Sequence, residues 1–227
     1  MSMLASAPPA ELLALDDKAE WADPLRAPSW RSLVDGKAGR EGAQALVSAL
    51  LPVGAGPGRF MSASRVSNVQ LDDGREVFDV MHRSLSVDAA DADCGWRAVA
   101  LAIGLTDGQV DAALREPCAE AEDLVGVVRD FGYRSAHQGA AAAWAFERRW
   151  PRVCGELAHA LAAHHGVGER ALAHLHDQEA QAGTVAERCH RLVTRYLREP
   201  WQVFEGRRAA REVVWGLTAL LESVCIQ

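Results

Sequence analysis

The residues best suited to chemistry lie close together, in the run HRSLSVDAADADCGWRAVA that starts at His82. This run holds a histidine, Cys94 and two aspartates, Asp91 and Asp93, just before the cysteine. A free cysteine, with a pKa of about 8.5, is mostly protonated at neutral pH, but a helix N-terminus and a nearby imidazole both stabilise its thiolate. The segment therefore predicts a thiol nucleophile at Cys94, with His82 as its base.

A helix is expected to start at Cys94. Asp91 and Asp93 are typical N-cap residues, the run after the cysteine is apolar, and Gly104 follows it as a stop signal. Backbone N–H groups at a helix entry have no partner inside the helix, so the turn formed by Asp91 to Cys94 is a candidate oxyanion-binding loop. Gly95 would leave room beside the sulfur for a substrate backbone.

The run D-x-x-C-G-W-R-A-V, at 91–99, resembles the signature around the nucleophile of OTU (ovarian tumour) cysteine proteases, which remove ubiquitin. Two later segments, 189–198 and 215–226, resemble later helices of that family. Ordinary members carry their catalytic histidine after the last of these, whereas here the similar element, 77–87, precedes the cysteine. The resemblance covers 59–227 and implies a circularly permuted OTU-like protease.

The resemblance also implies a mechanism that needs no cofactor. His82 would take the proton of Cys94, the thiolate would attack the carbonyl of a Gly-Gly isopeptide linkage, and water would release the acyl-enzyme. Many family members hold the imidazole with Asp or Asn two residues after the histidine, where this chain has Ser84. Asn68 is an alternative, and Asp79 is a poorer one because its offset from His82 puts it on the other face of a strand.

The expected fold class is α+β, with a small sheet flanked by many helices. The runs 59–71 and 75–87 are β-prone and joined by an Asp-Asp-Gly turn, and 224–227 would add a third strand. Residues 1–58 are expected to form an N-terminal helical or linker extension, and 59–227 the protease domain. After Cys94 the pattern predicts helices at 106–115, 118–131, 139–165, 167–179, 183–198 and 207–223, punctuated by Pro117, Pro151 and Pro200.

Composition limits the partners and the location. The net charge of −7 and the pI near 5.6 argue against a nucleic-acid partner, whereas an acidic groove would suit the Arg- and Gly-rich tail of ubiquitin. Five cysteines without regular spacing predict a reducing compartment rather than a disulfide framework. Neither a signal peptide nor a membrane-spanning run is evident in the sequence. The expected protein is a bacterial effector that leaves the bacterial cytoplasm by another route and acts in the host cytosol.

Other reactive or aromatic residues have structural interpretations. The remaining cysteines are expected to be core residues: Cys118, Cys154, Cys189 and Cys225. A local cluster without a zinc motif is expected to be a solvated surface: His159, His164, His165, His174, His176 and Asp177. Four tryptophans are expected to anchor the core or helix contacts: Trp144, Trp150, Trp201 and Trp215. Arg207, Arg208 and Arg211 are expected on an exposed helix face.

Two other functions fit the same residues. One is an OTU-like module without turnover that binds ubiquitin or a host protein. The other is a papain-like effector that uses the same cysteine and histidine for deamidation or acyl transfer. A ubiquitin probe with a C-terminal electrophile separates them, because only a deubiquitinase should be labelled efficiently, and only at Cys94.

Overall fold

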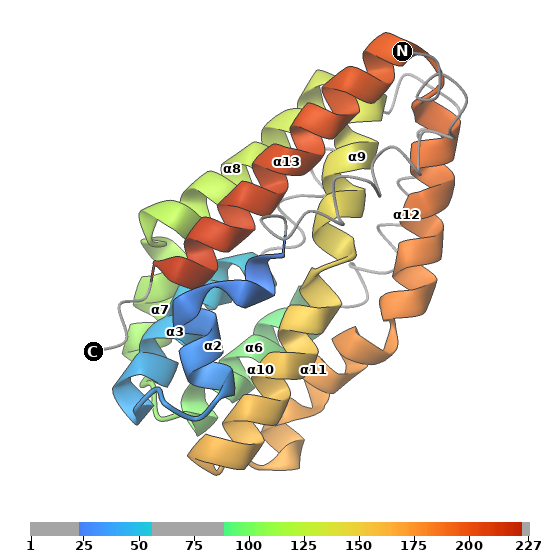
Figure 1. Cartoon of the computed structure of the whole chain (residues 1–227). Coiled ribbons are helices and arrows are strands. Elements are labelled where there is room, and N and C mark those ends of the chain that lie inside the picture. The colour runs from blue at the N-terminus through green and yellow to red at the C-terminus, as the bar shows by residue number, and fades with distance from the viewer. Residues whose placement is uncertain (1–22, 56–88, 224–227) are drawn as a thin grey trace.

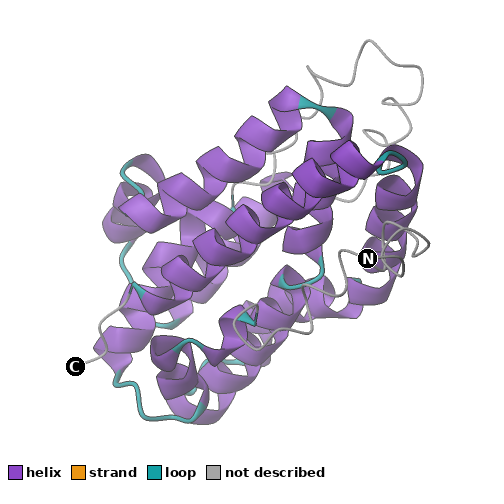
Figure 2. Cartoon of the chain, turned by 45° about the horizontal axis from the view of Figure 1, so that its top comes forward, coloured by secondary structure: helices purple, strands orange, loops and turns teal. Residues whose placement is uncertain are grey.

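The computed structural model describes residues 23–55 and 89–223. Every regular element in these two ranges is a helix (Figure 2). The predicted α+β fold with a central sheet is therefore wrong for the described residues. The segments expected to form that sheet, 59–71, 75–87 and 224–227, lie outside them.

Within each described range the helices follow one another with short connections. In chain order they are η2 (Pro24–Arg26, a single 3-10 turn), α2 (Pro28–Val34), α3 (Arg40–Gly54), α6 (Ala89–Ala102), α7 (Asp107–Arg115), α8 (Ala119–Arg134), α9 (Ala136–Glu147), α10 (Trp150–His165), α11 (Glu169–Ala180), α12 (Ala182–Tyr196) and α13 (Pro200–Glu222). None of the described helices is both long enough and apolar enough to cross a bilayer.

Local signals explain most of the helix limits. After α6 the chain turns at Gly104, whose φ of 99° is a conformation that other residues rarely adopt. Thr106 and Gln109 then form a reciprocal capping box that starts α7. Pro200 occupies the first turn of α13, where a missing N–H costs nothing. The limits of α7, α8, α11 and α12 agree with the expected helices to within three residues, whereas α13 begins seven residues before the expected start at 207.

One predicted helix is two. The run 139–165 divides into α9, which ends at Glu147, and α10, which begins at Trp150. Pro151 has no N–H to donate to the carbonyl of Glu147, four residues earlier, so one continuous helix would leave that carbonyl without its bond. The break lets α10 leave in a new direction and pack on α11 (Figure 1).

Helix α9 lies at the centre of the upper part of the molecule, packed on α8, α12 and α13 (Figure 1). It is rich in alanine, and eight of its residues are buried. Small side chains allow three helices to approach a fourth closely, so helix–helix packing fills the interior. This packing leaves no layer for a sheet among the described elements, which is the physical reason the α+β expectation fails.

Helix α3 belongs to the same core as the rest of the described chain. A continuous cluster of buried side chains runs from Leu25 to Leu221 and includes Leu46 and Leu50 of α3. Helix α3 packs on α6, α7 and α8. Residues 24–54, the described part of the predicted extension, thus share their core with the residues of the second described range.

Candidate functional site

Helix α6 carries the predicted nucleophile, but it starts earlier than expected. It begins at Ala89, so Asp91, Asp93 and Cys94 lie within the helix rather than in a turn before it. From Asp93 onward each N–H has a helical carbonyl four residues earlier, so the predicted oxyanion loop is absent from this segment. Cys94 therefore lies in the second turn of the helix rather than at its N-terminus.

Three predicted site residues lie outside the described part of the chain: the base His82, its orienting residue Ser84 and the alternative Asn68. Their roles therefore stay predictions. A described histidine close to this part of α6 comes from one of the helices that pack on it.

Helix α11 provides that histidine. A Cβ placed on Gly95 would lie 2.4 Å from Cγ and 2.5 Å from Cβ of His174, so this side chain sits directly on the Gly95 backbone. The space that was expected to admit a substrate is therefore filled by an imidazole. Gly95 directly follows Cys94, so the structure brings the predicted nucleophile and a half-buried histidine to the same stretch of α6. Sequence analysis had assigned His174 only to a solvated surface.

Packing fixes the rotation of α6. Trp96 is fully buried, 5.6 Å from the ring of Trp150 and pressed against Gly54 of α3. Arg97 donates to Asp107 at 3.1 Å and to Asp111 at 2.6 Å, which ties α6 to α7. The tryptophan and arginine of the OTU-like signature therefore have structural roles in this chain.

Two other cysteines are core residues, as expected. Cys154 and Cys189 are buried. Burial, and then the charges of Glu147 and Glu179, raise the pKa of Cys154 well above its ordinary value. Cys154 is therefore protonated at neutral pH and is no nucleophile. Cys225 lies outside the described residues.

The described cysteine at a helix N-terminus is Cys118, not Cys94. It is the N-cap residue of α8 and is half-buried. Its side chain makes no capping hydrogen bond, and the first turn carries two acidic residues, Glu120 and Glu122. The expectation that Cys118 is a core residue is met only in part, because its side chain is half-buried.

A polar group that the sequence did not reveal joins α9 to α13. The Nε2 atom of buried His137 lies 2.7 Å from Oε2 of Glu205 and 3.3 Å from Oγ of Ser135. A catalytic histidine uses one ring nitrogen for the carboxylate and the other for the nucleophile. Here both partners meet the same nitrogen, and Ser135 also caps α9. The group is therefore a structural link, and the sequence analysis did not identify any of its members.

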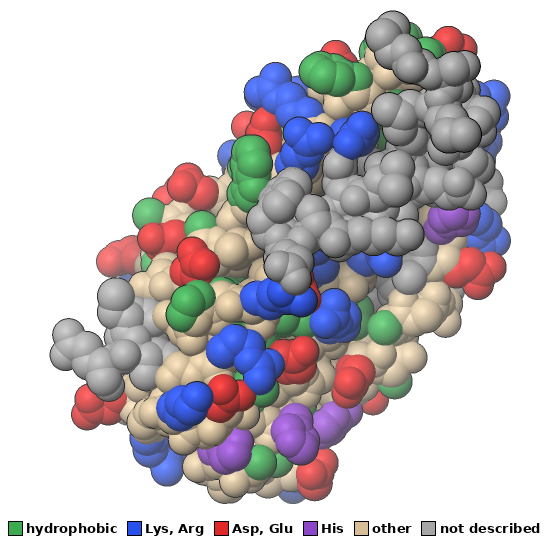
Figure 3. Space-filling view, in the orientation of Figure 1, with side chains coloured by type: hydrophobic (Ala, Val, Ile, Leu, Met, Phe, Trp, Pro, Cys, Tyr) green, Lys and Arg blue, Asp and Glu red, His purple; other side chains and the backbone are tan. Residues whose placement is uncertain are grey.

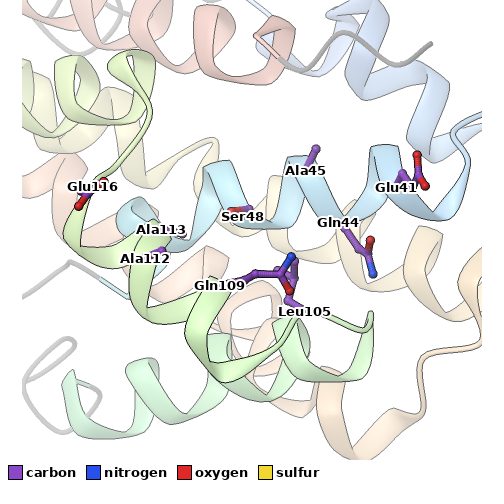
Figure 4. A pocket seen from close by; sticks show the side chains of 9 residues that line it. All are labelled: Glu41, Gln44, Ala45, Ser48, Leu105, Gln109, Ala112, Ala113 and Glu116. Carbon is purple, nitrogen blue, oxygen red and sulfur yellow. The ribbon is translucent and has the colours of Figure 1, made fainter.

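A pocket of about 430 Å³ lies between α3 and α7. Glu41 and Glu116 stand at its opposite ends, and small alanines line part of its wall (Figure 4). The residues that line it are Glu41, Gln44, Ala45, Ser48, Leu105, Gln109, Ala112, Ala113 and Glu116. They include two acids and no lysine or arginine, so the pocket favours a positively charged ligand.

The histidines of α10 and α11 do not form a metal site among the described side chains. His164 contacts the Val34 carbonyl at 3.2 Å, His176 lies 3.4 Å from a Glu169 carboxylate oxygen, and His159 is exposed. His164 and His176 thus contact different neighbours and do not converge on one metal-binding position.

The four tryptophans divide into two pairs. Trp144 and Trp150 are buried, as expected. Trp201 and Trp215 are 57% and 56% exposed, so neither anchors the core. The Trp201 ring does contact His137 of α9, in agreement with the expected role in helix contacts. On the same helix Arg208 is exposed, as expected, whereas Arg207 and Arg211 are only partly so.

Neither the protein-family models nor the curated proteins compared with this sequence contain a match. Function must therefore be inferred from the residues and their geometry.

Proposed function

We propose that this chain is a thiol hydrolase that cleaves isopeptide bonds of ubiquitin, with Cys94 as its nucleophile. The observation that carries the proposal is the contact of His174 with Gly95, which gives the residue beside Cys94 an imidazole neighbour. Cysteine–histidine chemistry occurs on unrelated folds. Because the described fold is helical, similarity of fold to OTU proteases does not support the proposal. The support comes from the positions of the nucleophile and its base.

The proposed reaction needs only these two side chains and water. The imidazole takes the Sγ proton, the thiolate attacks the isopeptide carbonyl, and the C–N bond breaks as the imidazolium returns the proton to the departing lysine amine. Water then hydrolyses the thioester. Gly95 directly follows Cys94 in α6, so the imidazole that rests on Gly95 lies one residue along the helix from the proposed nucleophile.

The pocket between α3 and α7 supports the choice of a basic substrate tail. Helices α3 and α6 are antiparallel, because Gly54 meets Trp96 while Gln44 donates to the Ile103 carbonyl. The pocket therefore lies beside the end of α6 away from Cys94, about 16 Å along its axis. An extended peptide covers that length in about five residues. The carboxylates of Glu41 and Glu116 could therefore pair with arginines of the substrate tail that lie a few residues before the scissile bond.

Ubiquitin carrying a C-terminal electrophile tests the proposal directly. The wild-type chain should form a one-to-one covalent adduct, Cys94→Ala should form none, and Cys118→Ala should react as wild type. Adduct formation by the Cys94→Ala protein, or none by a correctly folded wild type, would refute it. Circular dichroism of each variant shows whether the helices are intact.

A second candidate is binding without turnover, which the exposed aromatic residues of α13 favour. In that case labelled ubiquitin should show chemical-shift changes on titration with the wild-type chain, although the electrophilic probe leaves Cys94 unmodified. Substitution of the exposed aromatics, and not of Cys94, should then abolish those changes.

A further inference from the structure

Helix α13 displays an unusual set of side chains on its outer side. Nine tryptophan and phenylalanine residues lie in the described ranges, and six of them are buried. The other three are all on α13: Trp201 (57% exposed), Phe204 (74%) and Trp215 (56%). Exposed large apolar residues that cluster in this way mark interaction sites, whereas single ones need no explanation.

The three aromatics and exposed Arg208 form one stripe. Their spacings of three, four and seven residues place them on the same side of a helix. Figure 3 shows hydrophobic and basic side chains next to each other over α13. We call Trp201, Phe204, Arg208 and Trp215 the α13 stripe.

The helix that carries the α13 stripe is held firmly. Its opposite side packs on α8 and α9, and Glu199 and Gln202 cap its start. The Trp201 ring meets the edge of His137 at 4.9 Å and 83°, and His137 is itself bound to Glu205. Anchors presented on a fixed element lose little entropy on binding, which favours their use in recognition.

Charge around the stripe differs from that of the whole chain. Residues 201–215 contain three arginines and two glutamates, a net charge of +1, in a chain of net charge −7. Glu205 accepts from Gln138 at 3.1 Å, and Glu212 accepts from Arg208 at 2.8 Å. Because Arg208 and Glu212 balance each other, the excess of one positive charge comes from Arg207 and Arg211 against Glu205. The aromatic stripe thus lies on a segment of weakly positive net charge in an acidic protein, and it complements an acidic apolar partner.

Size decides what kind of partner fits. A buried aromatic side chain covers about 150–250 Å², so three that are more than half exposed offer roughly 300–400 Å². Each half of a standard stable complex buries about 800 Å². The stripe is therefore too small for a second globular copy of the chain but suits a short segment.

We propose that the α13 stripe is a docking surface for an acidic amphipathic helix of another protein. Trp201, Phe204 and Trp215 would take apolar side chains of that helix at i, i+3 and i+7 spacing, and the nearby arginines would face its carboxylates. Tryptophan and arginine are the residue types that dominate binding energy at such interfaces. The site is independent of Cys94.

A pair of synthetic peptides tests this inference. Each has roughly 18 residues, about five helical turns, with leucines on one face and either glutamates or lysines beside them. By fluorescence anisotropy the glutamate peptide should bind at least about tenfold more tightly than the lysine peptide at low salt. The double variant Phe204→Ala/Trp215→Ala should weaken it about tenfold or more. Arg208→Glu should reverse the charge preference.

The matched control is Leu101→Ala, which removes an exposed apolar side chain from α6 and should leave binding unchanged. Equal binding of both peptides, or wild-type binding by the double variant, would overturn the proposal. Binding to vesicles with about a quarter phosphatidylserine that is lost in the double variant would also overturn it, because the stripe would then be a membrane-binding surface. So would a wild-type dimer in sedimentation equilibrium that is monomeric in the double variant.

Discussion

Helices α6 and α13 both carry residues that invite a functional interpretation, and the structure treats them in opposite ways. Around Cys94 the neighbouring signature residues are used in packing, because Gly95 meets His174, Trp96 is buried and Arg97 is paired. On α13 the aromatics face solvent. A motif at helix spacing can serve packing and chemistry at once, whereas the aromatic side chains of the α13 stripe keep more than half of their surface exposed. The two helices therefore need different tests.

The largest expected effect concerns the base on α6. If His174 acts on Cys94, His174→Ala should lower the rate of ubiquitin-chain cleavage by about a thousandfold or more, because removal of a triad member leaves only binding and oxyanion contributions. His176→Ala, two residues away on the same helix, should cost little. Wild-type cleavage by His174→Ala together with its loss in His82→Ala would restore the assignment made from the sequence.

The next effect measures the difference between a buried and an exposed tryptophan. Trp96→Ala should lower the free energy of unfolding by about 3–5 kcal/mol, because it empties a fully buried site. Trp215→Ala should change it by less than about 1 kcal/mol. Denaturant melts of both variants give the comparison directly. Similar losses for the two would mean that α13 is covered in solution and that the stripe is not available to a partner.

A third prediction uses the end of α9, a region outside both helices. Burial raises the pKa of Glu147 from 4.5 to about 7. Below pH 4.5 the carboxyl is protonated in both states. Between 4.5 and about 7 the unfolded chain loses the proton first, so stability falls as pH rises, and above 7 the loss is complete.

The size of that loss is at most about 3 kcal/mol, from roughly 2.5 pH units at 1.36 kcal/mol each, and it is smaller if solvent reaches part of the side chain. Glu147→Gln should therefore stabilise the protein at pH 8 and have little effect at pH 4. Exposed Glu122→Gln serves as the control. A pH profile of unfolding that is unchanged by Glu147→Gln would show that this carboxyl is hydrated in the native state.

The smallest effect concerns the glycine beside the nucleophile. Gly95→Ala should cost about 1–3 kcal/mol of stability, because its new methyl group would overlap Cβ and Cγ of His174, atoms that cannot swing away. Gly126→Ala in α8, where a Cβ meets nothing within 4 Å, should instead stabilise by about 0.5–1 kcal/mol. A neutral Gly95→Ala would mean that α6 and α11 are less closely packed, and would weaken the case for His174 as the base.

Sequence periodicity predicted the helices between 106 and 223 well, because stop signals such as Gly104 and caps such as Thr106 act locally. The prediction of a single helix across Pro151 was wrong. The apolar pattern continues through this region, but Pro151 has no N–H with which to continue the helical hydrogen bonds. The exposure of Trp201 and Trp215 was not predictable, since it depends on which side of α13 meets α8 and α9. The contact of His174 with Gly95 likewise joins residues far apart in the chain.

The position of α3 has a consequence for how this protein could be divided or recombined. A fragment that starts at residue 59 would keep the whole cysteine signature but lose Leu46, Leu50 and the Gly54 surface on which Trp96 rests. Exposing that side of α6 would leave a large apolar area in water. A fragment that is made to study Cys94 must therefore also contain residues 24–54. The smallest folded unit that we expect comprises both described ranges.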